Sequence, residues 1–123
     1  MTELTIQVGD RSLSGTWLER NEETRATLID TMPIAGTANK WGDELYLHID
    51  VAADPTDTTS EVDPGTIAYW PDGPAICVFW GPTPASTDDK PVAASPVAPV
   101  AMLDSWASLE TVEGGTSLRI AVG

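Results

Sequence analysis

Three side chains that could take part in acid–base chemistry lie close together on one predicted strand. Over residues 44–49, leucine and isoleucine alternate with Glu44, Tyr46 and His48. Because side chains on a strand repeat every two residues, these three share one face. A histidine near a carboxylate could exchange a proton with a bound molecule. We favour the simpler interpretation, in which this row is the solvent-facing side of a strand.

The other reactive side chains give little support for a catalytic or metal site. His48 is the one histidine, which excludes any site that needs two, and Cys77 is the one cysteine, which excludes an internal disulfide and a cysteine-rich zinc cluster. Cys77 lies between apolar neighbours with no basic residue beside it, so we expect a buried, inert thiol. The acidic loop around 54–57 lacks the glycine and distal glutamate of a calcium loop. No glycine-rich phosphate-binding motif occurs. We therefore expect no catalytic residues, no metal and no cofactor.

The charge balance restricts the partners. Nineteen acidic residues face six lysines and arginines, a formal net charge of −13. Such charge destabilises a compact chain through self-repulsion, and concentrated salt screens that repulsion. A halophilic, archaeal, cytoplasmic protein is the preferred explanation, and an acidic surface for a basic partner is the alternative. Nucleic acid and membranes are not expected partners. The first twelve residues lack the basic and apolar regions of a signal peptide, and no stretch has transmembrane length.

The chain is dominated by short strand patterns with one helix between them. Asn21 is a good helix N-cap and Pro33 a stop, so the helix is predicted over about 21–32. A short second helical turn is predicted at 108–112. Residues 52–64 and 81–96 are predicted loops, and Pro99 interrupts the strand at 97–107. Strands are predicted at 3–8, 11–18, 34–41, 44–49, 66–70, 75–80, 97–107 and 117–122.

Many short strands with one clear helix are typical of a small all-β architecture. We predict a mainly β fold, a closed β-barrel with one capping α-helix, formed by residues 1–123 as a single domain. A two-layer sandwich is the alternative. The segment 66–80 is apolar on both faces of its two strands, which indicates a buried hairpin whose core includes Trp70, Cys77 and Phe79.

Two segments carry a family resemblance. NKWGDELYLHI at 39–49 and GTIAYWPDGPAICVFWGPTPAS at 65–86 resemble the small stand-alone cyclophilin-like proteins of bacteria and archaea. In that family a WG-acid-Glu-x-Tyr segment precedes a YWP-x-G-x-A-x-C-x-F-aromatic-G-x-T-P segment. The order of hairpin, helix, motif segments, Pro/Ser loop and final strand also matches. The matching residues are Trp41, Gly42, Asp43, Glu44, Tyr46, Tyr69, Trp70, Pro71, Gly73, Ala75, Cys77, Phe79, Trp80, Gly81, Thr83 and Pro84.

The resemblance implies a cyclophilin-like barrel and says less about activity, because these proteins as a group have no settled biochemical role. Similar barrels occur in enzymes that open lactam or urea-like amide bonds. True cyclophilins are prolyl isomerases with Phe-His-Arg and Phe-x-x-Gln-Gly-Gly segments, and this chain has neither. Relatives also show a serine, an asparagine and a Gly-Arg pair after the Pro/Ser loop. Here Ser95 is kept, but Ala98-Pro99 and Ala101-Met102 replace the others.

We therefore expect a small-ligand or peptide-binding module without the usual isomerase residues, and binding rather than turnover. The alternatives are an atypical peptidyl-prolyl cis-trans isomerase and an accessory partner of a lactam- or amide-hydrolysing assembly. A homodimer is compatible with each. Aromatic side chains would supply apolar contact and polar ones would orient the ligand. The predicted ligand-binding residues are Asn39, Trp41, Glu44, Tyr46, Tyr69, Trp80, Thr83 and Ser95.

Overall fold

The computed structural model describes residues 3–123, and its secondary structure is mainly β with one α-helix, as predicted. Met1 and Thr2, the first residues of the N-terminal stretch that lacks the pattern of a signal peptide, lie outside the described residues. None of the helices in the described part is long and apolar enough to cross a membrane. The elements are β1 Leu4–Val8, β2 Arg11–Trp17, α1 Glu22–Asp30, β3 Ile34–Thr37, β4 Asn39–Lys40, β5 Glu44–His48, β6 Thr59–Glu61, β7 Thr66–Trp70, β8 Ala75–Phe79, β9 Val92–Leu103, the 3-10 helix η1 Ala107–Thr111 and β10 Ser117–Val122.

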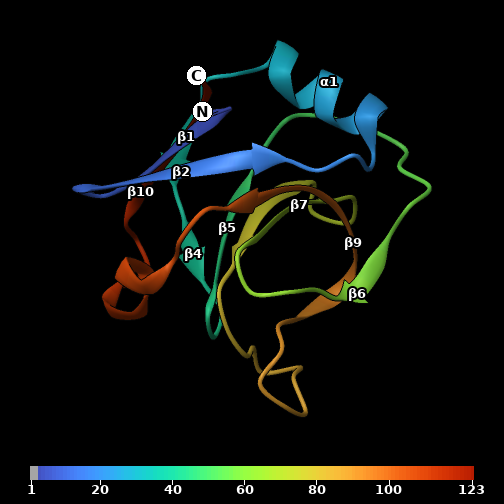
Figure 1. Cartoon of the computed structure of the whole chain (residues 1–123). Coiled ribbons are helices and arrows are strands. Elements are labelled where there is room, and N and C mark those ends of the chain that lie inside the picture. Colours follow the sequence, from blue (N-terminus) through green and yellow to red (C-terminus); the bar gives the residue numbers. More distant parts are fainter. Residues whose placement is uncertain (1–2) are drawn as a thin grey trace.

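The strands form one curved antiparallel sheet rather than two stacked layers (Figure 1). Its hydrogen-bonded order is β3-β10-β1-β2-β9-β7-β8-β5-β4, and β6 pairs with β9 outside this path. The end strands β3 and β4 are not paired with each other, so hydrogen bonds do not close the predicted barrel. They are instead successive parts of one extended stretch, joined through Ala38, whose amide donates to the carbonyl of Thr116 at 2.9 Å. The covalent chain therefore links the two edges of the sheet.

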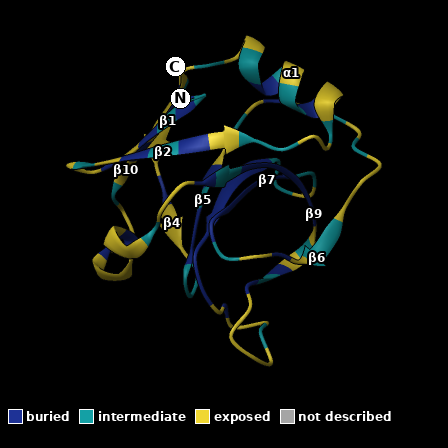
Figure 2. Cartoon of the chain, viewed as in Figure 1, coloured by how far each residue is buried: buried dark blue, intermediate teal, exposed yellow. Residues whose placement is uncertain are grey.

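The sheet carries apolar side chains on both faces over β7 and β8, as the sequence predicted. Ile76 and Val78 face the barrel core, the larger cluster inside the curved sheet. Cys77 and Phe79 point the other way, into a smaller outer cluster with Val62, Ala68, Ala93 and Val97. Figure 2 shows β7 as buried, whereas β4 and parts of β2, β6 and α1 are exposed. The outer cluster is important because the candidate site lies beside it.

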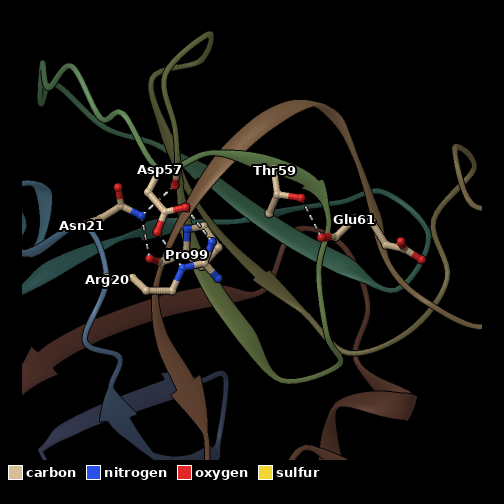
Figure 3. A network of polar contacts seen from close by, with 6 residues as sticks. All are labelled: Arg20, Asn21, Asp57, Thr59, Glu61 and Pro99. Atoms are coloured by element: carbon tan, nitrogen blue, oxygen red, sulfur yellow. Dashed lines mark hydrogen bonds and ion pairs between the residues drawn. The ribbon is translucent and has the colours of Figure 1, made fainter.

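Helix α1 is shorter than predicted and begins differently. It lies above the ring of strands in Figure 1, and Leu28 packs into the barrel core at 0% exposure. Asn21 occupies the N-cap position, but its backbone is left-handed (φ 51°) and its side chain makes no capping hydrogen bond. The Asn21 amide donates instead to the carbonyls of Asp57 at 2.9 Å and Pro99 at 3.0 Å (Figure 3). The expected capping role is therefore wrong, since this side chain ties the helix start to a loop and a strand.

Two segments predicted as loops contain strands. β6 at Thr59–Glu61 lies inside the polar stretch 52–64, and β9 begins at Val92, five residues before the predicted strand. The two pair with each other, and the Thr59 hydroxyl donates to the Glu61 carbonyl beside this pairing (Figure 3). Pro99 was expected to interrupt the ladder, and it pairs with Ala68 next to a register shift between Ile67 and Ala68. A bulge there accommodates a residue that has no N–H to donate.

Candidate functional site

A pocket of about 210 Å³ lies beside the outer cluster, where β5, β7 and β9 run next to the turn that precedes β5. Glu44 and Tyr46 reach it because they alternate on the outer face of β5, while Leu45 and Leu47 face the barrel core. Three aromatic side chains and one carboxyl group surround it, and small apolar residues of β9 complete the wall. The lining residues, here called the Glu44 pocket, are Trp41, Glu44, Tyr46, Trp70, Ala93, Ala94 and Val97.

The carboxyl group of Glu44 is the buried polar element of this pocket. The residue is 5% exposed and pairs across the sheet with Phe79. Burial raises the pKa of Glu44 to about 7, and a hydrogen bond with the Cys77 thiol lowers it in part. Burial also raises the pKa of Cys77 well above its ordinary value, and the neighbouring Glu44 charge adds to this effect. The pocket therefore holds a carboxyl group that changes charge near neutral pH beside a thiol that stays protonated.

The aromatic walls stand at a steep angle to one another. The ring centroids of Tyr46 and Trp70 are 6.3 Å apart with an interplanar angle of 77°. The Trp70 indole N–H donates to the Ser95 hydroxyl at 2.6 Å, and Ser95 donates to the Asp72 carboxylate at 2.6 Å. Because these two hydrogen bonds engage the polar edge of the indole, the Trp70 ring is held in place and its apolar surface faces the pocket.

The turn before β5 fixes the position of Trp41. The Trp41 amide donates to the Glu44 carbonyl at 2.9 Å, and the Asp43 amide donates to the Pro82 carbonyl at 3.0 Å. Gly42 has φ +60°, and a Cβ there would lie 2.7 Å from the Cα of Thr83. Only glycine tolerates both the backbone conformation and this close approach. The Trp-Gly-Asp segment is therefore a tight turn packed against the 82–84 loop.

The structure brings Trp41, Glu44 and Tyr46 of the predicted site residues together in the pocket. Ser95 is beside it and holds Trp70 rather than lining the cavity. Asn39 is exposed on β4, where it pairs with Tyr46, and is not one of the lining residues.

The remaining predicted site residues lie elsewhere. Tyr69 is 1% exposed in the barrel core, and its hydroxyl donates to the Val51 carbonyl at 2.7 Å and accepts from the Ala53 amide at 3.2 Å. Trp80 is also in the barrel core, and its indole N–H has no acceptor among the described residues. The Thr83 hydroxyl donates to the Val92 carbonyl. These three side chains serve packing and loop attachment in this structure, not the Glu44 pocket.

Four lining residues were missed. Trp70 was predicted to be core, but it is partly exposed and borders the pocket, whereas Cys77 and Phe79 are buried as predicted. Ala93, Ala94 and Val97 were not considered because most of this segment was predicted as loop. Trp70 could have been found from strand parity, since it shares the outer face of the sheet with Cys77.

The row Glu44, Tyr46 and His48 is not the uniform solvent face that was favoured above. Glu44 is buried, Tyr46 is half-buried and His48 is exposed. His48 stacks edge-on against Tyr46 with centroids 5.6 Å apart at 88°. The carboxyl and the imidazole therefore lie at opposite ends of the row with the phenol between them.

Other polar clusters in residues 3–123 lie at the surface, where they join one loop or short helix to another segment. Arg20 makes a bidentate ion pair with the carboxylate of Asp57, with N–O distances of 2.8 and 2.9 Å, beside the start of α1 (Figure 3). Arg11 donates to the Ser108 carbonyl and the Thr111 hydroxyl, each at 2.8 Å. Across the described residues, no three or more His, Cys, Asp and Glu side chains are arranged to hold a metal ion.

Comparison with known proteins places this geometry in a family. A family model described as Cyclophilin-like matches residues 2–121. The chain is similar to the hypothetical protein AF2241 from Archaeoglobus fulgidus, with 34% identity, a TM-score of 0.81, and coverage of 99% of this chain and 95% of that one. It shares its fold with McbB, solved in complex with tryptophan, at 16% identity and a TM-score of 0.69, over 98% of this chain and 44% of McbB. No match is found among curated proteins.

Proposed function

The chain belongs to the cyclophilin-like family, and we propose that it is a binding module that takes up a small ligand in the Glu44 pocket. The observation that carries this proposal is the convergence of three aromatic side chains on one buried carboxyl group. Apolar walls with a few well-placed polar groups are the usual composition of a small-molecule site. The sheet gains no stability from burying an acid there, because an apolar side chain would pack at less cost.

The size of the pocket favours a small molecule over an extended peptide. A cavity of about 150 Å³ accommodates benzene in an engineered protein, and the Glu44 pocket measures about 210 Å³. One aromatic ring with a short polar substituent would therefore fill it. McbB, which shares the fold, was solved with tryptophan, so tryptophan is included among the probes proposed below.

The positions of the arginines weigh against the alternative of an atypical prolyl isomerase. Arg11 is bonded to Ser108 and Thr111, Arg20 to Asp57, and Arg25 stacks over Trp17 with 5.6 Å to the ring centroid. Arg119 is exposed on β10. None of the four lines the Glu44 pocket, so no guanidinium is placed there to stabilise a twisted prolyl amide. The other alternative is that the protein is an accessory partner of a lactam- or amide-hydrolysing assembly, and co-purification with a larger subunit would support it.

The acidic composition supports a salt-rich setting. We propose that the protein works in an archaeal cytoplasm with concentrated salt, as a single domain formed by the whole chain. The net charge of −13 and the similarity to an archaeal protein support this proposal.

The experiment is a two-dimensional ¹H–¹⁵N NMR titration in molar KCl with benzylamine, benzyl alcohol, tryptophan and an Ala-Pro peptide. We expect shifts of the Trp41 and Trp70 signals with at least one small probe. Ala94 is an exposed lining residue, so Ala94→Phe should fill the pocket and abolish these shifts. Ala26→Phe, at an exposed position of α1, is the matched control and should leave them unchanged. Absence of any response to all four probes, or shifts that survive Ala94→Phe, would contradict the proposal. Catalysed cis–trans exchange of the peptide would restore the isomerase alternative.

A further inference from the structure

We propose that the Glu44 pocket recognises small organic cations, namely amines or quaternary ammonium compounds with an apolar substituent, by pairing the positive nitrogen with the Glu44 carboxylate inside the aromatic walls. This inference rests on the proposed function and names the class of ligand. It follows from the partners that Glu44 lacks, the side chains around it and the charge of the whole molecule.

Glu44 has no basic partner within residues 3–123. The ion pairs of this part of the chain join Arg11 to Asp10, Arg20 to Asp57 and Lys90 to Asp63. Burial and the Cys77 thiol are the causes of the altered Glu44 pKa, and no cation contributes. A thiol is a weak hydrogen-bond donor, so it offsets little of the cost of a buried carboxylate. A cation from solution would supply the missing countercharge.

The aromatic side chains suit a cation better than a neutral ligand. A positive charge within about 6 Å of a tryptophan or tyrosine ring is attracted by the negative face of the π-system, and most strongly when water is excluded. Tyr46 and Trp70 stand at 77° to one another, so they form two sides of a corner, and Trp41 adds a third ring. Ser95 holds Trp70 through its indole N–H and so keeps this corner in shape without a ligand.

The small side chains of β9 leave room for the apolar part of the ligand. Ala93, Ala94 and Val97 line the pocket with no charge and little bulk. Outside the pocket, the net charge of −13 attracts cations and repels anions at low salt, and concentrated salt screens this effect. In concentrated salt the selectivity for cations therefore depends on the carboxyl group and the rings of the pocket itself.

The competing interpretation is that protonated Glu44 donates a hydrogen bond to a neutral carbonyl or hydroxyl ligand. The two interpretations predict opposite pH dependence, because a cation pairs with the ionised form of Glu44 and a neutral acceptor pairs with the protonated form. The titratable groups that face Glu44 are Cys77 of β8 and Tyr46 of its own strand, and His48 touches the far side of Tyr46. The lining residues from β7 and β9 do not titrate.

The test is calorimetric titration of the intact protein with benzylamine, benzyltrimethylammonium and benzyl alcohol at pH 6, 7 and 8 in constant KCl. With a Glu44 pKa of about 7, the ionised fraction rises about tenfold from pH 6 to pH 8, so the affinity for both cations should rise by about that factor. In two buffers of different ionisation enthalpy, binding of either cation at pH 7 should release about half a proton per ligand. The affinity for benzyl alcohol should stay constant over this pH range.

Variants separate the pocket from the general charge of the protein. Glu44→Gln should weaken binding of both cations at pH 8 at least tenfold, abolish proton release and change the affinity for benzyl alcohol by less than about twofold. Glu110→Gln makes the same change in net charge at an exposed position and should behave like the unaltered protein. His48→Gln should keep the pH dependence. Circular dichroism of each variant confirms that it is folded.

The outcomes distinguish this inference from the function it rests on. Binding of benzyl alcohol as tight as that of the amines, or amine binding indifferent to Glu44→Gln, would overturn the cation assignment and leave the pocket as a binding site. A benzyl alcohol affinity that falls as the pH rises would establish the protonated acid as the donor instead. No binding of any of the three probes would overturn both the inference and the proposed function.

Discussion

Replacing Glu44 with glutamine should remove a pH dependence from the stability of the fold. Burial raises the pKa of Glu44 from 4.5 to about 7, so between these values the folded chain holds a proton that the unfolded chain has released. The stabilising contribution of this group is fully present below pH 4.5, where both states are protonated. It is lost as the pH rises toward 7, because ionisation then favours the unfolded chain.

The magnitude follows from the same two values. A rise of the pKa from 4.5 to about 7 corresponds to about 3 kcal/mol, at about 1.4 kcal/mol for each tenfold change in proton affinity. Glu44 is only 5% exposed, so solvent screening reduces this little. Between pH 5 and pH 8 the loss is about 2 to 3 kcal/mol, a large share of the 5–15 kcal/mol that is usual for a domain.

The assay is urea unfolding followed by tryptophan fluorescence at pH 5, 6, 7 and 8 in constant molar KCl. The free energy of unfolding of the unaltered chain should fall by about 2 to 3 kcal/mol more over this range than that of Glu44→Gln. Glu110→Gln removes the same charge from an exposed site and should retain the full slope. Equal slopes for Glu44→Gln and the unaltered chain would refute the reasoning, because they would show that the carboxyl is not desolvated by the fold.

Three further predictions concern the turn, the thiol and the charge. Gly42→Ala should lower the free energy of unfolding in urea by more than about 1 kcal/mol, because Gly42 has a positive φ and a Cβ there would contact Thr83. Gly115→Ala should lower it less, because Gly115 has φ +84° but nothing lies near its Cβ. Cys77 is 1% exposed with a raised pKa, so at pH 8 a thiol reagent should modify it only as fast as the chain unfolds; rapid modification of the folded protein would contradict this. Raising KCl from 0.1 to 2 M should increase the Tm by clearly more than sucrose of equal osmolality does, because salt screens the net charge of −13. A Tm that does not change with KCl would contradict a halophilic origin.

Most strands could be predicted because local signals were sufficient there. β7 and β10 have the predicted bounds, since an apolar run and a regular alternation define them, and β1 begins one residue later than predicted. The Gly9-Asp10 turn sets the pairing of Val8 with Arg11. β6 and the first half of β9 could not be predicted. Thr59–Glu61 is polar, and β9 contains Pro96 and Pro99, so these strands exist through their pairing with each other and with β7 rather than through their own propensity.

The candidate site was predictable only where it lies on one strand. Glu44 and Tyr46 share a face by the two-residue period, and Trp41 is carried beside them by the tight turn at Gly42. Tyr69 and Trp80 were misplaced because aromatic residues in a buried hairpin can face either side of the sheet. Tyr69 alternates with Trp70 along β7 and faces the barrel core, and Trp80 follows the last residue of β8 into the same core. The role of Ser95 behind Trp70 depends on a contact between residues 25 apart, which no local pattern shows.

The carboxyl group of Glu44 carries a cost to stability that the other acidic side chains of residues 3–123 do not. The other acidic side chains of residues 3–123 are exposed or half-buried, and some share an ion pair, as Asp57 does with Arg20. Glu44 is buried against a thiol and has neither arrangement, so at neutral pH it weakens the fold. Natural proteins retain such costs mainly where function requires them. A bound cation would stabilise the ionised Glu44, because the carboxylate then has a partner that the folded chain alone does not provide. The same residue therefore links the pH dependence of stability to the affinity for ligand, and a stabilising Glu44→Gln variant that no longer binds amines would be the signature of that link.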